Sequence, residues 1–239
     1  MTDYITRFSL RQRVEHASVG LLFIVLATTG LIQEFFPMRW AGWMILEMGG
    51  IDRVRWIHRV AGIGLAFVVF SHVIVSVLQV VRGQSKPTMV PTRKDFDDVV
   101  IVTRYYLQLS DEQPRFDRYD FRQKLEYWGL IFGSLIMTVT GFMLYFPVLT
   151  TRFLPGEVIP AALIAHGREG LLAFLVIITW HFFNSHLSPE AFPIDTSIFT
   201  GKISRERMEK EHPLEYERVL ASGEGKLEGP GPGESRGPG

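Results

Sequence analysis

Residues 58–81 have the sequence HRVAGIGLAFVVFSHVIVSVLQVV, which contains no Asp, Glu, Lys or Arg from Val60 onward. Three other stretches, 16–33, 127–151 and 170–189, are equally free of these charged residues. Each is about 18 residues long or longer, the length that a helix needs to cross a hydrocarbon core of roughly 30 Å. Lipid offers no hydrogen-bond partner to peptide groups, so each stretch must be helical. The sequence therefore predicts an all-α integral membrane protein with a bundle of four transmembrane helices.

Prolines and charged residues place these helices at about residues 14–36, 54–81, 125–146 and 160–187. We expect one domain, residues 1–220, to contain them. The polar chain between the second and third helices includes an amphipathic segment near 96–109, which we expect to lie on the membrane surface. Residues 221–239 are rich in Gly, Pro and Glu, and are predicted to be disordered because they lack apolar side chains.

The distribution of basic residues predicts the orientation in the membrane. Basic residues are frequent in the N-terminal segment, in residues 82–124 and after the fourth helix, whereas only Arg152 lies between the third and fourth helices. Because cytoplasmic loops carry the excess of Lys and Arg, both termini and the central loop should be cytoplasmic. Arg39, Arg53 and Arg55, in the first outer loop, weaken this bias.

The chain contains no cysteine. Disulfides, thiolate zinc sites, iron–sulfur clusters and covalently attached c-type haem are therefore excluded within it. Any redox centre must be held by histidine or methionine. Nothing in the sequence indicates nucleic-acid binding.

Two helix pairs have similar motifs. Thr29-Gly30 near the end of the first helix corresponds to Thr140-Gly141 near the end of the third, and His58-x3-Gly62 corresponds to His166-x3-Gly170. The pattern indicates one helix pair used twice. Chance similarity between apolar helices is the alternative.

Six of the seven histidines lie in or next to the helices, and their spacing predicts two levels in the membrane. His58 and His72 are 14 residues apart, so they share a helix face about 21 Å apart along the axis. His166 and His181 are 15 residues apart and about 60° off a shared face. The topology puts His58 and His166 near the outer side. His16, His72 and His181 fall near the cytoplasmic side.

Two levels of histidine suit two haems b, because a six-coordinate haem iron takes two axial imidazoles. Ionisable groups at membrane depth are usually functional. The residues four positions after these histidines are small and leave room for a flat macrocycle: Gly20, Gly62, Ser76, Gly170 and Ser185. Close helix packing is another reason for small residues, and a lone histidine can instead form a hydrogen bond or carry protons. His16, His72 and His181 compete for two positions, and a third haem would need the unused histidine with His186. His212 is expected to be solvated.

Several motifs resemble a known family. They are Glu15-His16, Arg55-Trp56-Ile57-His58 with Gly62, Arg122-Gln123-Lys124, Leu163-Ile164-Ala165-His166 with Gly170, Trp180-His181, Phe199-Thr200-Gly201-Lys202-Ile203-Ser204 and Glu211-His212-Pro213. Over residues 5 to 220 the sequence resembles the membrane cytochrome b (gamma) subunit of formate dehydrogenase. The b-type subunits of nickel–iron hydrogenases and thiosulfate reductases form the wider group.

The resemblance implies two haems b that pass electrons between a periplasmic partner and the quinone pool. It implies His58 and His166 as ligands of the outer haem, and His16 and His181 as ligands of the inner haem. His72 has no counterpart in the formate dehydrogenase pattern, and the step from His166 to His181 is one residue longer than in the family. The internal repeat instead favours His72 with His181, so both pairings stay open.

The resemblance also implies a quinone pocket near the inner haem, formed partly by the segment before the third helix. Asp120, Arg122 and Gln123 are the candidates, and Asp120 and Arg122 stand where the family has Asn and Gly. Asp120 would accept a proton. It would equally suit the N-cap of the third helix.

Together these observations predict a dihaem cytochrome b in a bacterial-type inner membrane. It would be the electron-transfer subunit of a quinone-linked oxidoreductase complex. Its periplasmic-side partner would be a multihaem c-type cytochrome, an iron–sulfur protein or a dehydrogenase. Two alternatives are a stand-alone transmembrane reductase of the b561 type and a haem-free membrane anchor or transporter.

Overall fold

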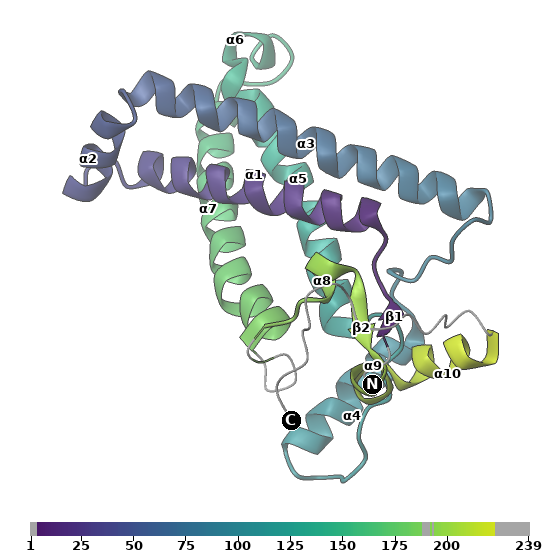
Figure 1. Ribbon diagram of the computed structural model, residues 1–239. Coiled ribbons are helices and arrows are strands. Elements are labelled where there is room, and N and C mark those ends of the chain that lie inside the picture. Colours follow the sequence, from purple (N-terminus) through teal and green to yellow (C-terminus); the bar gives the residue numbers. More distant parts are fainter. Residues whose placement is uncertain (1–3, 188–191, 193, 223–239) are drawn as a thin grey trace. The chain divides into compact units, whose positions relative to one another are not determined.

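A computed structural model describes residues 4–187, 192 and 194–222 (Figure 1). Four of its helices are long and apolar enough to cross a membrane: α1 (Leu10–Glu34), α3 (Ile51–Val81), α5 (Phe121–Tyr145) and the helix Val158–Leu187. Each lies within four residues of the expected bounds, so the predicted set of four helices is confirmed. Most of the predicted tail, residues 223–239, lies outside the described residues, and residues 221 and 222 end a helix.

The chain divides into two compact units. The helical unit contains Val14–Ser85 and Trp128–Ile194. The polar unit contains Met1–Arg13, Lys86–Tyr127 and Asp195–Gly239. Each unit thus joins segments that are far apart in the sequence.

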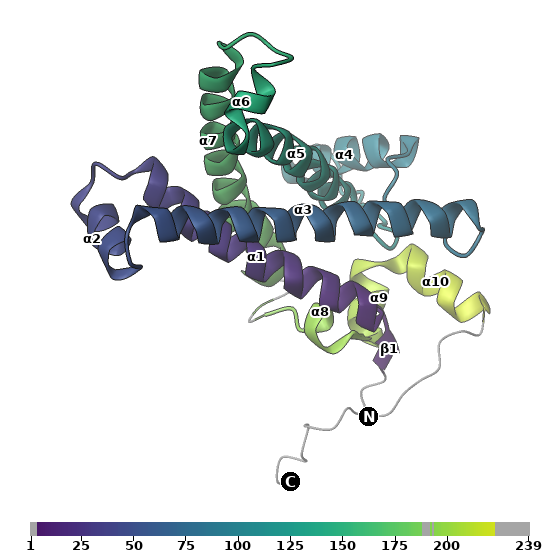
Figure 2. The ribbon, with the colours of Figure 1, turned by 90° about the horizontal axis from the view of Figure 1, so that it is seen from above.

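The long helices of the helical unit expose their apolar side chains. Leu21, Ile63 and Phe67 are each more than 60% exposed in the protein. Apolar side chains form no hydrogen bonds, so they can face hydrocarbon. The backbone groups find no partner in lipid and are satisfied within the helix. Two short helices follow the first helix of each pair: α2 (Arg39–Glu47) after α1, and α6 (Pro147–Thr150) after α5 (Figure 2).

The fourth membrane helix is not regular. It begins as α7 (Val158–Val176) and continues as two π-helical segments, η1 (Ile177–His181) and η2 (Phe183–Leu187). The uniform α-helix predicted for residues 160–187 is therefore wrong at its C-terminal end. A π-segment inserts an extra residue into a turn and is frequent at functional sites. It changes the face on which every later side chain lies, including that of His181.

The polar unit has a small sheet in addition to its helices, which the all-α prediction missed. β1 (Tyr4–Thr6) pairs antiparallel with β2 (Lys202–Ser204), with Ile5 opposite Ile203. These two residues pack with Met208, Tyr216 and Val219 in a compact core. The helices of this unit are α4 (Arg93–Tyr106), α8 (Ser197–Thr200), α9 (Arg205–Glu211) and α10 (Pro213–Ser222). The sheet therefore ties the N-terminal segment to the chain that follows the fourth membrane helix.

A glycine makes this junction possible. Gly201 has a φ of 82°, a conformation that L side chains rarely adopt. A Cβ atom at this position would lie 2.8 Å from the carbonyl oxygen of Phe8. The carbonyl oxygen of Gly201 in turn accepts hydrogen bonds from the backbone N–H groups of Arg7 and Phe8, at 2.8 and 3.1 Å. This contact explains a motif that hydrophobicity alone does not require.

A buried carboxylate joins three segments of the polar unit. Glu215 of α10 accepts from Arg7 at 3.0 Å and from Arg118 at 2.6 Å. Arg7 also donates to the carbonyl oxygen of Arg118 at 2.8 Å. Glu215 and Arg7 are buried, and buried charges persist only when they are paired and hydrogen-bonded.

His212 is buried in the same unit, so the expectation that it is solvated was wrong. It is 7% exposed, and its Nδ1–H donates to the carbonyl oxygen of Asp117 at 2.8 Å. Burial, with the positive charge of Arg7 adding to it, lowers the pKa of His212 to about 4. The histidine is therefore neutral at pH 7 and fixes the turn between α9 and α10.

We expect His212→Asn to flatten the pH dependence of the polar unit's stability. An unfolded histidine titrates near pH 6.5, whereas folded His212 titrates near 4. Between these values only the unfolded state binds the proton. Stability is thus full above about pH 6.5 and falls by up to about 3 kcal/mol as the pH drops to 4. Asn keeps an N–H donor for Asp117 but does not titrate.

Hydrogen exchange of the α9 and α10 amides measures this effect in the full chain, after correction for the intrinsic effect of pH. Protection should fall with pH in the wild type and stay nearly level in the variant. An equal fall in both proteins would show that His212 is not the titrating group.

Candidate functional site

Two histidines from different helices face each other in the helical unit. The ring centroids of His58, on α3, and His166, on α7, lie 6.2 Å apart, with 72° between the ring planes. Both side chains are half-buried. The structure thus brings together the two residues that were expected at one level of the membrane.

A threonine holds the ring of each histidine. Thr29 Oγ1, on α1, lies 2.8 Å from Nδ1 of His58, and Thr140 Oγ1, on α5, lies 2.9 Å from Nδ1 of His166. Both threonines come from the Thr-Gly motif that the sequence repeats. The internal repeat therefore corresponds to one contact built twice, with the same atoms in each half.

The hydroxyl hydrogens determine which ring nitrogen is protonated. Thr29 Oγ1 donates to the carbonyl oxygen of Val25 at 2.7 Å, and Thr140 Oγ1 donates to that of Ile136 at 2.7 Å. A carbonyl oxygen can only accept, so each hydroxyl has already used its hydrogen. Nδ1 of each histidine must then donate to the threonine, which leaves Nε2 with a lone pair for a metal.

The glycine after each threonine makes room for the imidazole. A Cβ atom on Gly30 would lie 3.3 Å from Cε1 of His58, and one on Gly141 would lie 3.2 Å from Cε1 of His166. Both distances are tighter than ordinary side-chain contacts. The Thr-Gly pair thus gives each ring a hydrogen-bond acceptor at Nδ1 and a close backbone at the adjacent Cε1.

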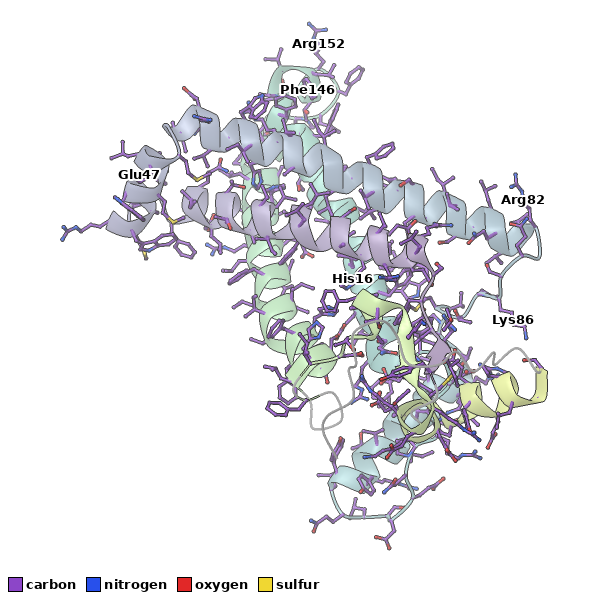
Figure 3. The ribbon with its side chains drawn as sticks, viewed as in Figure 1. His16, Glu47, Arg82, Lys86, Phe146 and Arg152 are labelled. Carbon is purple, nitrogen blue, oxygen red and sulfur yellow. The ribbon has the colours of Figure 1, made fainter. Side chains whose placement is uncertain are left out.

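A second histidine pair has the same separation. The ring centroids of His16, on α1, and His181, at the end of η1, are also 6.2 Å apart, with 35° between the ring planes. Figure 3 labels His16 at the end of α1 that is nearer the N-terminus. The 15-residue step from His166 predicted an offset of about 60° on a regular helix. The π-segment absorbs one residue, so this offset does not apply.

His72 contacts Glu15, an acidic residue that the sequence placed in a motif but to which it gave no role. Its Nδ1 lies 2.8 Å from a carboxylate oxygen of Glu15, the residue before His16 on α1. The ring of His186, in η2, lies 5.4 Å from that of Phe182 in an edge-on arrangement. The signal for Glu15 was present in the sequence, since an acidic residue at membrane depth requires a partner.

The geometry of both pairs suits one metal ion between two imidazoles. A metal–imidazole bond is about 2 Å long and the ring centre lies about 1 Å further, so two rings on opposite sides of one ion have centroids about 6 Å apart. A protein-only metal site needs more ligands, and no cluster of three His, Cys, Asp or Glu that could hold a metal ion occurs in the described part of the chain. Haem needs only two axial residues, because the porphyrin supplies four nitrogens. The residues present fit haem.

The candidate quinone residues lie in the polar unit, at the start of α5. Asp120 Oδ1 accepts from the backbone N–H of Gln123 at 2.9 Å, and the Asp120 N–H donates to Gln123 Oε1 at 3.2 Å. This reciprocal pair caps the helix. Arg122 donates to Asp120 Oδ2 at 2.7 Å. A cavity of about 140 Å³ has the neighbouring residues Arg118, Tyr119 and Lys124 in its lining, together with residues between 87 and 98. The three candidate residues themselves do not line it.

Comparison with known proteins gives two kinds of match. The family model for prokaryotic cytochrome b561 matches residues 7–187. The cytochrome b556 subunit of the nitrate-inducible formate dehydrogenase of Escherichia coli K12 is 24% identical over 227 residues, which cover 94% of this chain and 95% of that protein. A second cytochrome b556 subunit of formate dehydrogenase from the same strain is also 24% identical over 227 residues, covering 95% and 98%.

Proposed function

The chain belongs to the prokaryotic cytochrome b561 family, and from this we propose that it is a dihaem b-type cytochrome that transfers electrons between the quinone pool and a redox partner. Its four apolar helices and its family make it a multi-pass bacterial membrane protein. Membership in a cytochrome b family implies haem b as cofactor.

The two histidine pairs carry this proposal. His58 with His166 would hold one haem, and His16 with His181 would hold the other. Each pair joins two helices at a ring separation of 6.2 Å. Bound haem supplies one-electron redox chemistry, while the protein sets ligation, orientation and surroundings. Thr29 and Thr140 would hold the rings of His58 and His166 through their hydrogen bonds to Nδ1.

We assign His16, and not His72, to the pair with His181. The 6.2 Å ring separation supports this choice, as does the contact of His72 with Glu15. In this assignment the carboxylate of Glu15 holds His72 next to the ligand. The resemblance to formate dehydrogenase subunits favours the same pairing.

The proposed orientation places both termini and residues 82–124 in the cytoplasm, following the basic residues. The pair of His58 and His166 is then near the outer side of an inner membrane, and the pair of His16 and His181 near the inner side. A periplasmic-side dehydrogenase would be the partner, since the relatives named above are formate dehydrogenase subunits and match over nearly their full length. A multihaem c-type cytochrome or an iron–sulfur protein would serve the same role.

The quinone site is proposed at residues 118–124, with Asp120, Arg122 and Gln123. The polar side chains at the start of α5 and the neighbouring cavity support it. Asp120 also caps the N-terminus of α5, because its side chain accepts from the backbone N–H of Gln123. Proton uptake by Asp120 would therefore weaken both its ion pair with Arg122 and the cap.

A second candidate is a stand-alone b561-type reductase, because the family that the chain matches is named cytochrome b561. It would need no partner subunit. Mild solubilisation and affinity purification separate the two, because a subunit co-purifies with a dehydrogenase or another redox protein and a stand-alone reductase does not.

A visible spectrum of the purified protein, reduced minus oxidised, tests the proposed function. We expect the absorbance of b-type haem and two non-covalent haems per chain after extraction, with reduction on addition of a quinol analogue. Three haems would bring His72 and His186 in as ligands. No haem in a folded sample would contradict electron transfer and favour the anchor or transporter.

A further inference from the structure

We propose that Thr29 and Thr140 are positioning residues that fix the tautomer of His58 and His166 and lower the reduction potential of the haem between them. The inference rests on the proposed function, because it needs a haem at this pair. The sequence analysis had identified these two threonines only as part of the repeated Thr-Gly motif.

The hydrogen bonds at both threonines run in one direction. Each threonine hydroxyl donates to the carbonyl four residues earlier, at 2.7 Å, and so can only accept from the histidine. A valine in place of threonine would have almost the same shape but no acceptor. Nδ1–H of His58 would then lose its partner, and the ring could turn or exchange tautomers. The ring of His166 would keep a hydrogen bond to the carbonyl oxygen of Met137, so Thr140→Val should have the smaller effect.

The rings of His58 and His166 are confined by the protein around them. Thr29 is 1% exposed, so no water can replace its hydroxyl as the acceptor for His58. Gly30 and Gly141 bring their backbones so close that a Cβ atom would lie 3.3 and 3.2 Å from the two rings. The ring orientation is therefore set by the protein before any ligand is bound.

The hydrogen bond at Nδ1 would also change how strongly each histidine donates electrons to the iron. A histidine that donates its second N–H to an acceptor is a more basic ligand. A more basic axial ligand stabilises ferric over ferrous iron, and hydrogen bonding around the ligands is one of the protein's means of tuning haem potential. Both histidines that would hold this haem have the same contact with a threonine, so the two effects would add.

The test compares Thr29→Val and Thr140→Val with Thr29→Ser, and uses Thr138→Val as the matched control. Thr138 lies on α5 and donates to the carbonyl of Ser134 at 2.7 Å, so the control loses the same type of backbone contact. Redox titration of the full-length protein resolves two midpoint potentials. In each of the two test variants, the midpoint potential of one haem should rise by up to about 59 mV. For one electron, this is about a tenfold change in the ferrous-to-ferric ratio. The other haem should not move, and Thr29→Ser and Thr138→Val should match the wild type.

The possible results separate this inference from the proposed function. A protein that binds no haem would overturn both. A protein with two haems whose potentials are unchanged in Thr29→Val and Thr140→Val would overturn the inference alone. An equal shift in Thr138→Val would show a general packing effect and would also overturn it. Nitrogen-15 NMR of the haem-free protein gives a second readout, since the His58 ring should be protonated at Nδ1 in the wild type and lose this preference in Thr29→Val.

Discussion

His58→Ala is expected to reduce the haem content from two per chain to about one, with the remaining haem keeping its absorbance. The variant removes one of the two imidazoles that face each other at 6.2 Å. Even the loss of a residue that only supports a metal ligand typically costs 10–100-fold in metal affinity, so the loss of the ligand itself should cost more. His166 would then be the only residue of this pair left to hold the haem.

The measurement is a haem count with a reduced-minus-oxidised spectrum, made on His58→Ala, His166→Ala and the double variant. Because both residues belong to one site, the double variant should lose no more than either single variant. Full haem content in His58→Ala would remove this residue from the ligand set. Loss of both haems, with the helices still folded, would mean that the two sites do not form independently.

The membrane helices could be predicted from sequence because lipid imposes a simple rule on them. A charge-free run such as Val60–Val81 has to be helical at membrane depth. The bounds predicted for its helix, residues 54–81, lie within three residues of those of α3. Helix geometry converts sequence spacing into distance along the axis, so the two levels of histidine could also be predicted, and they stay a prediction. These predictions needed no knowledge of side-chain contacts.

The side-chain contacts could not be predicted in the same way. The repeat of Thr29-Gly30 was visible, but its partner His58 lies on another helix, and no periodicity shows which atoms meet. The π-segment that carries His181 has no signature in hydropathy, so a regular helix gave the wrong offset. Glu15 and His72 are 57 residues apart, and only packing brings them to 2.8 Å.

The polar unit shows the same limit more strongly. Its short strands and its burial of His212 depend on segments from three parts of the chain. A strand of three residues such as Tyr4–Thr6 is too short for a periodic pattern to reveal it. The motif around Gly201 signalled only that some backbone constraint exists there, and the structure shows which one.

The most informative comparison is between His16→Ala and His72→Ala, because sequence reasoning left these two residues as rivals for one position. We expect His16→Ala to lose one haem of two, since its ring lies 6.2 Å from that of His181. His72→Ala should keep both haems, since the contact of its ring nitrogen with Glu15 gives it a task other than ligation.

The two variants control for each other, because each removes one imidazole from the same part of the helical unit. Glu15→Gln adds a third arm: it keeps the shape of the side chain next to His16 and removes its charge, and it should also retain two haems. If His72→Ala lost a haem while His16→Ala kept two, the internal repeat would be the better guide to ligation than the ring geometry. Two haems in both variants would mean that neither histidine is an essential ligand, and His181 would then need another partner.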